Sequence, residues 1–304
     1  MVAVDLVSSW GTRCGIAEYA SDLVNAADKA EVHFRVHAPQ SAGMLHSFEG
    51  QIVHLNHEDG LLRMWGPDEV RRLQAMGKRV LMTKHNSDFS CRTALASACN
   101  VVVVHETSGD GFVHIPHGIH DWVNPGIKPQ MKIGTAGFPQ GHKAFTETAK
   151  LAKELGVGLL VITAESPHGD AHATADAIHA VHPDAEVITD WLSKDEVAAK
   201  MAECVVTVFL RWSNMSGISG AVRLGLMSGR PVVITQDRQF RDLYTQYPEE
   251  VYLIDLPVPS MDAAKSVTEF AISHQLKKPK RILYDMSWKR CAEQYVNLYR
   301  GLAA

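Results

Sequence analysis

Short apolar runs alternate with helical patterns along nearly the whole chain, and this alternation is the strongest restriction on its fold. The first series of apolar runs is VAVDLV, EVHFRVHA, QIVHLN, KRVLMTKH and NVVVVH. A second series contains KIGTAG, GLLVITA, VVTVFL and PVVIT. Strands that alternate with helices in this way predict parallel sheets covered by helices on both faces. Two series predict two doubly wound α/β domains.

Two prolines and a glycine interrupt the pattern in VNPGIKPQM, residues 123–131. The sequence therefore predicts an N-terminal Rossmann-like domain over residues 1–127 and a C-terminal one over residues 128–285. An amphipathic helix is expected over residues 286–304. Ligands of open α/β sheets bind beyond the carboxyl ends of the strands, so the loops that follow the strands are the candidate sites. If the domains face each other, these loops would line one cleft.

Composition narrows the class of protein. A net charge of -4 gives no reason to expect a polyanion partner, and 46% hydrophobic residues are typical of a globular protein. The five cysteines are odd in number and form no CxxC pair, which argues against a disulfide framework or a structural zinc site. The chain begins without a signal-peptide pattern and has no apolar run of membrane-spanning length, so we expect a cytoplasmic protein.

Residues 211–235, RWSNMSGISGAVRLGLMSGRPVVIT, contain no acidic residue. The pattern predicts a loop, a helix from about Ser219 that stops before Gly229, and a buried strand. Glycines and serines at a helix start leave backbone N–H groups open beside the positive end of the helix dipole. That arrangement favours an anion, most often phosphate. An ordinary capped helix is the alternative.

Six segments, in this order along the chain, carry a family resemblance: CGIAEYASDLV, IVHLNHEDGLL, LMTKHN, VHIPHGI, KIGTAGFPQGHKAF and SGISGAVRLGLMSGRPVVITQDRQFRDL. Together they resemble the retaining glycosyltransferases of the GT-B fold, especially family 4. The closing SWKRCAEQYVNLYR resembles the helix that returns to the first domain in that family. The resemblance implies two Rossmann-like domains that face each other across a cleft and a nucleotide-sugar donor.

The resemblance also implies site residues. Those expected to bind the donor are Gly15, Lys143, Arg211, Ser216, Gly217, Ile218 and Ser219. His85, at the end of a strand, would contact the transferring sugar, and with Lys143 it forms the predicted catalytic pair. A weaker set is expected near the acceptor or the cleft: Glu18, His57, Glu58 and His117.

The family usually carries two glutamates eight positions apart in the donor helix, and this chain has Ser216 and Leu224 at those positions. A catalytically degenerate nucleotide- or glycan-binding protein is therefore an alternative to a hexosyltransferase. A nucleotide-sugar epimerase is another, although it would need acid–base carboxylates, which are scarce in these loops.

No cofactor or metal is expected, because Lys143 and backbone N–H groups could stabilise the leaving diphosphate. The histidines at 168, 172, 179 and 182 could suggest a metal site, but they lack a metal-binding spacing and are interpreted as a solvated helix.

Few residues separate NVVVVH from VHIPHGI, where the family usually has a longer helix and strand. The acceptor side of the N-terminal domain is therefore expected to be shallow, and a shallow surface suggests a large acceptor. Candidates are a glycan, a lipid-linked sugar or a modified nucleobase in DNA. Residues 1–127 hold 10 Lys+Arg and 14 Asp+Glu, a net charge of 10 - 14 = -4, which does not favour DNA. The sequence predicts no oligomeric state.

Overall fold

The computed structural model describes residues 1–39, 42–57, 65–85, 93–106, 111–122, 124–166, 169–211, 217–254, 260–274 and 279–304. The chain forms two compact units, and each is described here by itself. Unit 1 contains Met1–Gly118, residues 217–218 and Met286–Ala304. Unit 2 contains the segment from Ile119 to Arg211 and Ser219–Asp285.

The segment between residues 118 and 130 belongs to unit 2, whereas the sequence pattern places the domain boundary after residue 127. One reason is a contact of Arg230, whose guanidinium donates hydrogen bonds to the carbonyl oxygens of Ile127 and Ala202, both at 2.5 Å from Nη2. Arg230 thus connects the residues just before Gln130, where the second sheet begins, to unit 2.

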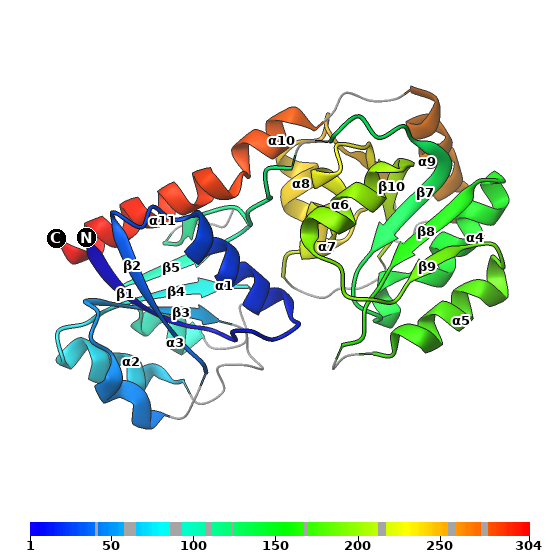
Figure 1. Cartoon of the computed structure of the whole chain (residues 1–304). Helices are drawn as coiled ribbons and strands as arrows, with labels where there is room; N and C mark the ends of the chain where they lie inside the picture. Colours follow the sequence, from blue (N-terminus) through cyan, green and yellow to red (C-terminus); the bar gives the residue numbers. More distant parts are fainter. Residues whose placement is uncertain are drawn as a thin grey trace. The chain divides into compact units, whose positions relative to one another are not determined.

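Unit 1 has a six-stranded parallel sheet in the order β2-β1-β3-β4-β5-β6 (Figure 1). Its strands are β1 (Val2–Val7), β2 (Val32–His37), β3 (Ile52–His57), β4 (Arg79–Lys84), β5 (Val101–Val104) and β6 (Val113–His114). Its helices are α1 (Gly15–Ala26), α2 (Pro67–Ala75), α3 (Thr93–Ala98) and α11 (Trp288–Ala303), and η1 (Ala42–Ser47) is a short 3-10 helix.

Alternate residues of each central strand of unit 1 enter different cores, as the two-residue period of a strand requires. Ile52 and Leu81 pack with residues of α1 and α11. Val53, Val80 and Met82 join the opposite cluster, which includes residues of α2 and α3. Both faces of the sheet are therefore covered, which explains why these strands are apolar throughout.

The C-terminal helix α11 is part of the unit 1 core. Trp288 and Tyr295 are buried there beside residues of α1. The chain passes so close to this helix at Gly118 that a Cβ there would lie 2.2 Å from Cδ2 of Trp288. Glycine is thus required at this position for the helix to approach.

Unit 2 has a second six-stranded parallel sheet, in the order β12-β11-β10-β7-β8-β9. Its strands are β7 (Gln130–Ala136), β8 (Gly158–Ile162), β9 (Glu186–Ile188), β10 (Cys204–Phe209), β11 (Val232–Thr235) and β12 (Tyr252–Ile254). Its helices are α4 (Phe145–Leu155), α5 (Ala171–Val181), α6 (Lys194–Ala202), α7 (Gly220–Met227), α8 (Arg241–Gln246), α9 (Met261–His274) and α10 (Lys280–Asp285). Two 3-10 helices, η2 (Gly141–Lys143) and η3 (Arg238–Phe240), complete it.

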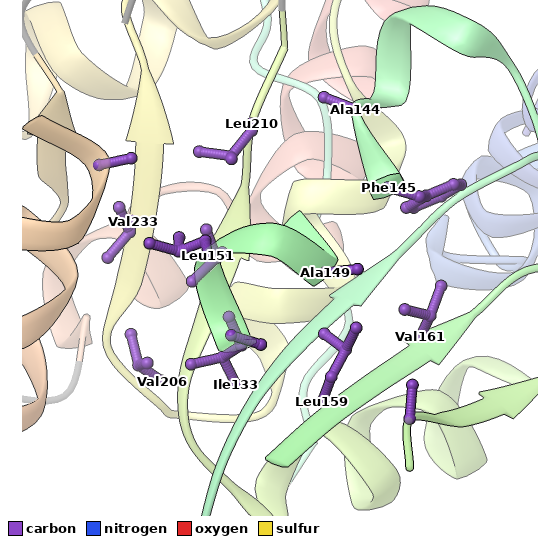
Figure 2. Packing of buried hydrophobic residues seen from close by; sticks show 14 of the residues in the cluster. Ile133, Ala144, Phe145, Ala149, Leu151, Leu159, Val161, Val206, Leu210 and Val233 are labelled. Atoms are coloured by element: carbon purple, nitrogen blue, oxygen red, sulfur yellow. The ribbon is translucent and has the colours of Figure 1, made fainter. Parts of the chain in front are cut away.

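The core of unit 2 is divided by its sheet in the same way. Figure 2 shows the larger cluster, where Ala149 and Leu151 of α4 lie with strand residues such as Leu159 and Val161. The intervening Leu160 points into a smaller cluster that includes residues of α6 and has Leu224 of α7 packed against it. These clusters hold α4 and α7 in place at the carboxyl ends of β7 and β10.

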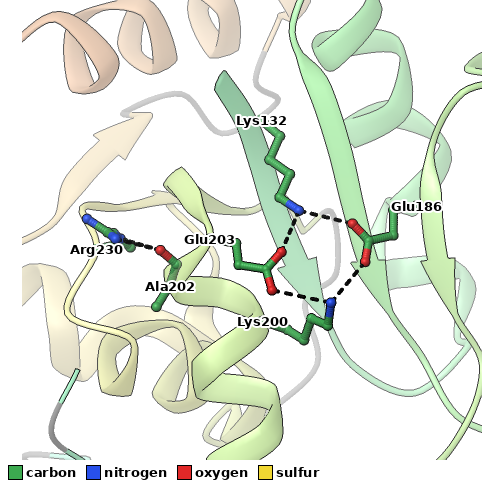
Figure 3. Close-up of polar contacts among 6 residues, drawn as sticks. All are labelled: Lys132, Glu186, Lys200, Ala202, Glu203 and Arg230. Atoms are coloured by element: carbon green, nitrogen blue, oxygen red, sulfur yellow. Dashed lines mark hydrogen bonds and ion pairs between the residues drawn. The ribbon is translucent and has the colours of Figure 1, made fainter. Parts of the chain in front are cut away.

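A group of four charged residues lies near the start of β7 (Figure 3). Nζ of Lys132 is 3.0 Å from Glu186 and 2.9 Å from Glu203, and Lys200 pairs with the same two carboxylates at 3.4 and 3.2 Å. Lys132 belongs to the amino-terminal half of its strand, away from the carboxyl end where ligands are expected. We interpret this network as structural, since every charge in it has an opposite partner.

Among the described residues, no helix has both the length and the apolar composition needed to cross a membrane.

Candidate functional site

Lys143 lies beside a glycine at the carboxyl end of β7. Gly137 follows this strand with φ +145°, a conformation that favours glycine. A Cβ at Gly137 would meet Cε of Lys143 at 3.4 Å and Cβ of Ala221 at 3.5 Å. The lysine side chain therefore runs along the backbone of Gly137 next to the first turn of α7. Among the described residues, none forms a hydrogen bond or ion pair with its Nζ.

Arg211 is a second cation in this region, and only 3% of its surface is exposed. It directly follows β10, and its backbone N–H donates to Oγ1 of Thr235 at 3.0 Å. Its guanidinium donates to Oε1 of Gln239 and, at 2.7 Å, to Oγ of Ser219. It also lies over the ring of Phe240, 5.2 Å from the centroid. These neutral partners hold the guanidinium in place without cancelling its charge.

Arg223 is a third buried cation, but its charge is neutralised. Its guanidinium forms an ion pair with Asp242, whose side chain is fully buried, and donates at 3.0 Å to the carbonyl oxygen of Ser219. Arg223 thus joins α7 to α8 and supports the segment that carries Ser219. In contrast, neither Lys143 nor Arg211 forms an ion pair with any carboxylate that the structure describes.

The charges of these groups influence one another. Burial, and then the neighbouring Arg211, lower the pKa of Lys143 well below its usual value, while Asp237 acts in the opposite direction. Burial lowers the pKa of Arg211 to about 10, so it remains a cation at neutral pH. Burial, Lys143 and Arg211 together lower the pKa of His142 to about 4 and keep it neutral. When all of these groups are ionised, the three cations exceed the two carboxylates near them, Asp237 and Asp242, by one positive charge.

The start of α7 adds backbone donors to this positive group. Ser219 occupies the N-cap position, but its side chain makes no capping bond, because its Oγ accepts from Arg211 instead. The first N–H groups of α7 therefore have no side-chain cap from Ser219. Open N–H groups at a helix start, together with a surplus of positive charge, form an arrangement that could bind a phosphate or diphosphate. No group of three described side chains could hold a metal ion.

The structure thus brings together three of the predicted donor residues, Lys143, Arg211 and Ser219. Gly217 and Ile218 precede the N-cap, and Gly217 has φ +107°. Ser216 lies outside the described residues. Sequence analysis missed His142, Asp237 and Gln239 as members of this group, although QDRQF directly follows a predicted strand and so satisfied the rule used to find the other loops.

A second group of polar residues lies at the carboxyl ends of β3 and β4 in unit 1. His85 follows β4, is 8% exposed, and its Nε2 bonds to Oδ1 of Asn56 in β3 at 2.5 Å. Its ring contacts Tyr19 edge-on, with centroids 4.6 Å apart, and lies 5.0 Å from the ring of His105. Burial, followed by the neighbouring histidines, lowers the pKa of His85 well below its usual value. His85 is therefore a neutral ring at physiological pH.

The other residues predicted in unit 1 occupy different environments. His117 is half-buried, with its ring 5.1 Å from that of Tyr19 and its Nδ1 3.1 Å from the carbonyl oxygen of Gly118. His57 ends β3 and is only 1% exposed, since it continues the buried strand. Glu18 is half-buried in the first turn of α1.

Two further predictions for unit 1 concern loop residues. Gly15 begins α1, and a Cβ added there would meet no other atom, so its backbone is open to a ligand. Glu58 lies outside the described residues.

Two of the histidines in α5 and at its end bond to backbone carbonyl oxygens. Nε2 of His179 lies 3.1 Å from the carbonyl oxygen of Ala185, and Nε2 of His182 lies 3.2 Å from that of Val157. His172 and His179 are exposed on α5, as the predicted solvated helix requires, whereas His182 follows the helix and is half-buried. His168 is outside the described residues.

A search for related proteins found likeness in structure but not in sequence: no family profile and no curated protein sequence matches the chain. A sucrose-phosphate synthase from Thermosynechococcus elongatus has a TM-score of 0.74 and 13% identity, with 100% of this chain and 99% of that one covered. The HepE protein of Anabaena in complex with UDP and glucose has a TM-score of 0.70 and 10% identity, covering 99% and 100%.

An alpha-glucosyltransferase in complex with UDP-glucose and DNA containing an abasic site has a TM-score of 0.64 and 11% identity, with 98% of both chains covered. Each match extends over nearly the whole of both chains, so the similarity concerns the complete fold and not one unit alone. The chain therefore has the GT-B glycosyltransferase fold, with one Rossmann-like sheet in each of its two units.

Proposed function

We propose that this protein is a retaining hexosyltransferase that moves a sugar from a nucleotide-sugar to a hydroxyl group of a large acceptor. The observation that carries this proposal is the pair Lys143 and Arg211 beside the uncapped start of α7. Arg211 is buried, Lys143 is half-buried, and the single carboxylate that acts on both, Asp237, can balance only one of the two charges. Such a surplus of positive charge is unfavourable unless a ligand supplies negative charge. A diphosphate meets this requirement, and a diphosphate is the leaving group of a nucleotide-sugar.

The same cations would supply the catalytic stabilisation. When the glycosidic bond breaks, negative charge grows on the phosphate oxygen, and fixed donors aimed at that oxygen lower the barrier. Arg211 is fixed by Gln239 and Ser219, so it needs little reorganisation during the reaction. Lys143 adds a second charge. We therefore propose a reaction that does not depend on a metal ion.

We propose retention because the chain resembles retaining glycosyltransferases, and a mechanism without a protein general base is consistent with the few carboxylates near Lys143 and Arg211 among the described residues. In our proposal the acceptor hydroxyl attacks the face from which the diphosphate departs, and the leaving phosphate oxygen takes the hydroxyl proton. The new glycosidic bond forms as the bond to the phosphate breaks, and the nucleoside diphosphate leaves with the proton. His85 remains neutral and serves to bind a sugar hydroxyl.

For the acceptor, we favour a large neutral glycan or lipid-linked sugar over DNA. One structural neighbour was solved with DNA, and another with UDP and glucose. The excess of carboxylates over basic residues in residues 1–127 would repel a polyanion, since binding to nucleic acid depends on neutralising its phosphates. A modified nucleobase in DNA is therefore the less favoured acceptor.

The main competing function is a degenerate protein that binds a nucleotide or a glycan without transferring sugar. The lack of carboxylates in residues 211–235 favours it. An epimerase is less favoured, because among the described residues the carboxylates near Lys143 and Arg211 are few: Asp242 is engaged by Arg223, and Asp237 accepts the N–H of Gln239.

The test is a screen of UDP-, GDP-, ADP- and TDP-sugars by calorimetric titration and by donor hydrolysis, with wild type, Lys143→Met and the control Lys150→Met. Lys150 is an exposed residue of α4, so its substitution removes the same charge outside the site. We expect one donor to bind, its affinity to fall about 10- to 100-fold in Lys143→Met only, and slow hydrolysis in wild type.

Binding without hydrolysis, and without transfer to a panel of oligosaccharides, would identify the degenerate binding protein. Absence of binding to any of the donors would refute the proposed function. Transfer to duplex DNA bearing a hydroxymethylated base would overturn our preference for a glycan acceptor.

A further inference from the structure

Asn56 holds His85 between the ends of two neighbouring strands. Oδ1 of Asn56 is 2.5 Å from Nε2 of His85, and both residues are buried. The backbone contributes a second link, because the N–H of His85 donates to the carbonyl oxygen of His57 at 3.2 Å. His85 is thus linked to β3 twice, by its ring and by its backbone N–H.

The orientation of the Asn56 amide is determined by its other contacts. Its Nδ2 lies 2.9 Å from Oγ of Ser8, after β1, and 3.3 Å from the carbonyl oxygen of Ile16, in the first turn of α1. A carbonyl oxygen can only accept, so the nitrogen of the amide must face Ile16. The amide oxygen then faces His85, and it too can only accept.

The proton of a neutral His85 must therefore reside on Nε2, where it is donated to Asn56. Nδ1 is left with its lone pair, and no described residue hydrogen-bonds to it. We propose that Asn56 is a positioning residue that fixes His85 as the Nε2–H tautomer, so that Nδ1 presents a hydrogen-bond acceptor to a hydroxyl of a bound carbohydrate. The role assigned to the carbohydrate rests on the proposed function, whereas the tautomer does not.

Neighbouring histidines have the opposite arrangement. Nδ1 of His105 is 2.9 Å from the carbonyl oxygen of Ile115, and Nδ1 of His117 is 3.1 Å from that of Gly118. Each must carry its proton on Nδ1 when neutral, because a carbonyl oxygen only accepts. Three rings around Tyr19 thus include two of one tautomer and one of the other, and His85 has a side-chain amide as its partner.

The neighbours of His85 explain why an amide is suited to this task. Among the described residues, the titratable groups that act on the pKa of His85 are His54, His57, His105 and His117, and Tyr19 lies against its ring. None of these is a carboxylate. A carboxylate in place of Asn56 would accept the same hydrogen bond but would favour the imidazolium form, which has no acceptor to offer. The amide fixes the tautomer and leaves the ring neutral.

The experiment is a long-range 15N–1H spectrum of the full chain labelled at histidine, with the three rings assigned from single His→Gln variants. In wild type we expect His85 to be protonated on Nε2 alone, and His105 and His117 on Nδ1 alone. Finding His85 protonated on Nδ1 would overturn the proposal without any variant of Asn56. This measurement needs neither a substrate nor activity.

The variants Asn56→Ala, Asn56→Asp and Ser8→Ala test the cause. We expect Asn56→Ala to lose the single Nε2–H form, Asn56→Asp to move the titration of His85 upward by at least one pH unit, and Ser8→Ala to keep the tautomer through Ile16. The control Asn25→Asp makes the same charge change on an exposed residue of α1. Unchanged His85 signals in folded Asn56→Ala and Asn56→Asp proteins would refute the role of Asn56.

Once a donor is known, Asn56→Ala should lower kcat by about 10- to 100-fold and change the KM for the donor by less than about threefold. A rise in KM alone would contradict positioning at the reacting sugar. If no donor binds at all, the proposed function is refuted. The spectrum of the histidine rings still tests the tautomer of His85 independently.

Discussion

Acidification should weaken unit 1 selectively through His54, a buried residue of β3. Its Nδ1 lies 2.7 Å from the hydroxyl of Tyr299, and its Nε2 lies 2.8 Å from Oγ1 of Thr83. The hydroxyl of Tyr295 lies 2.7 Å from Oγ1 of Thr83 and 2.9 Å from the hydroxyl of Tyr19, so the hydrogen bonds form a continuous network. The network joins α11 and α1 to the sheet, so protonation of His54 acts on the attachment of both helices.

The magnitude follows from the pKa of His54, which burial lowers from 6.5 to about 3. Between these two pH values the unfolded state binds a proton and the folded state does not. Stability is therefore complete above about pH 6.5 and is lost as the pH falls toward 3. At 1.36 kcal/mol per pH unit, a change from pH 7.5 to pH 4.5 should lower the free energy of opening by ~2.7 kcal/mol, or about 100-fold in the equilibrium constant.

Native-state hydrogen exchange can measure this loss in each unit separately, since two units need not unfold together. Protection of amides in β3 and β4, corrected for the intrinsic rate, is compared between the two pH values in wild type, His54→Gln and the exposed control His33→Gln. We expect His54→Gln to be weaker than wild type at pH 7.5 but to lose ~2.7 kcal/mol less on acidification. An equal loss in wild type and His54→Gln would refute this reasoning.

Three further predictions concern unit 2. Binding of the nucleoside diphosphate should take up protons, because the ligand favours the charged form of Lys143, whose pKa is lowered by burial; titrations in buffers of different ionisation enthalpy should give different heats, and equal heats would contradict this prediction. Arg223→Met should destabilise unit 2 by about 3–5 kcal/mol in urea unfolding, since it leaves Asp242 buried and unpaired, and a loss below 1 kcal/mol would contradict this estimate. Leu224→Glu should cost about 1–3 kcal/mol by the same assay, with Leu224→Met as a matched control below about 1.5 kcal/mol. An increase in donor affinity without this cost would show that a glutamate is accommodated there.

The periodicity of the sequence was sufficient to predict the two sheets. Strand residues such as Leu159 and Leu160 enter opposite clusters, and burial on both faces is the reason that such strands appear as continuous apolar runs. The position of Lys143 could also be predicted, because the site rule for parallel sheets places functional loops after strands. Local pattern and fold class were enough for these features.

The partners of the site residues could not be predicted in this way. Gln239 contacts Arg211 from 28 positions along the chain, and Asn56 contacts His85 from 29. Such contacts arise from the order of strands in the sheet, which places β11 beside β10 and β4 beside β3, and apolar periodicity does not reveal that order. His57 illustrates a related limit, because the apolar run QIVHLN stops one residue earlier whereas the strand continues through His57.

The two arginines of the donor segment show why a segment without carboxylates can still serve an anion. Both Arg211 and Arg223 contact Ser219, but their remaining partners differ. Asp242 neutralises Arg223, which makes it a structural link between α7 and α8, whereas Gln239 holds Arg211 by an amide oxygen that carries no net charge. A carboxylate at position 239 would fix the same geometry and cancel the charge. The neutral partner therefore leaves the charge of Arg211 without an ion pair among the described residues, so that Asp237 offsets its burial only electrostatically and an anion in contact with it would offset the burial further.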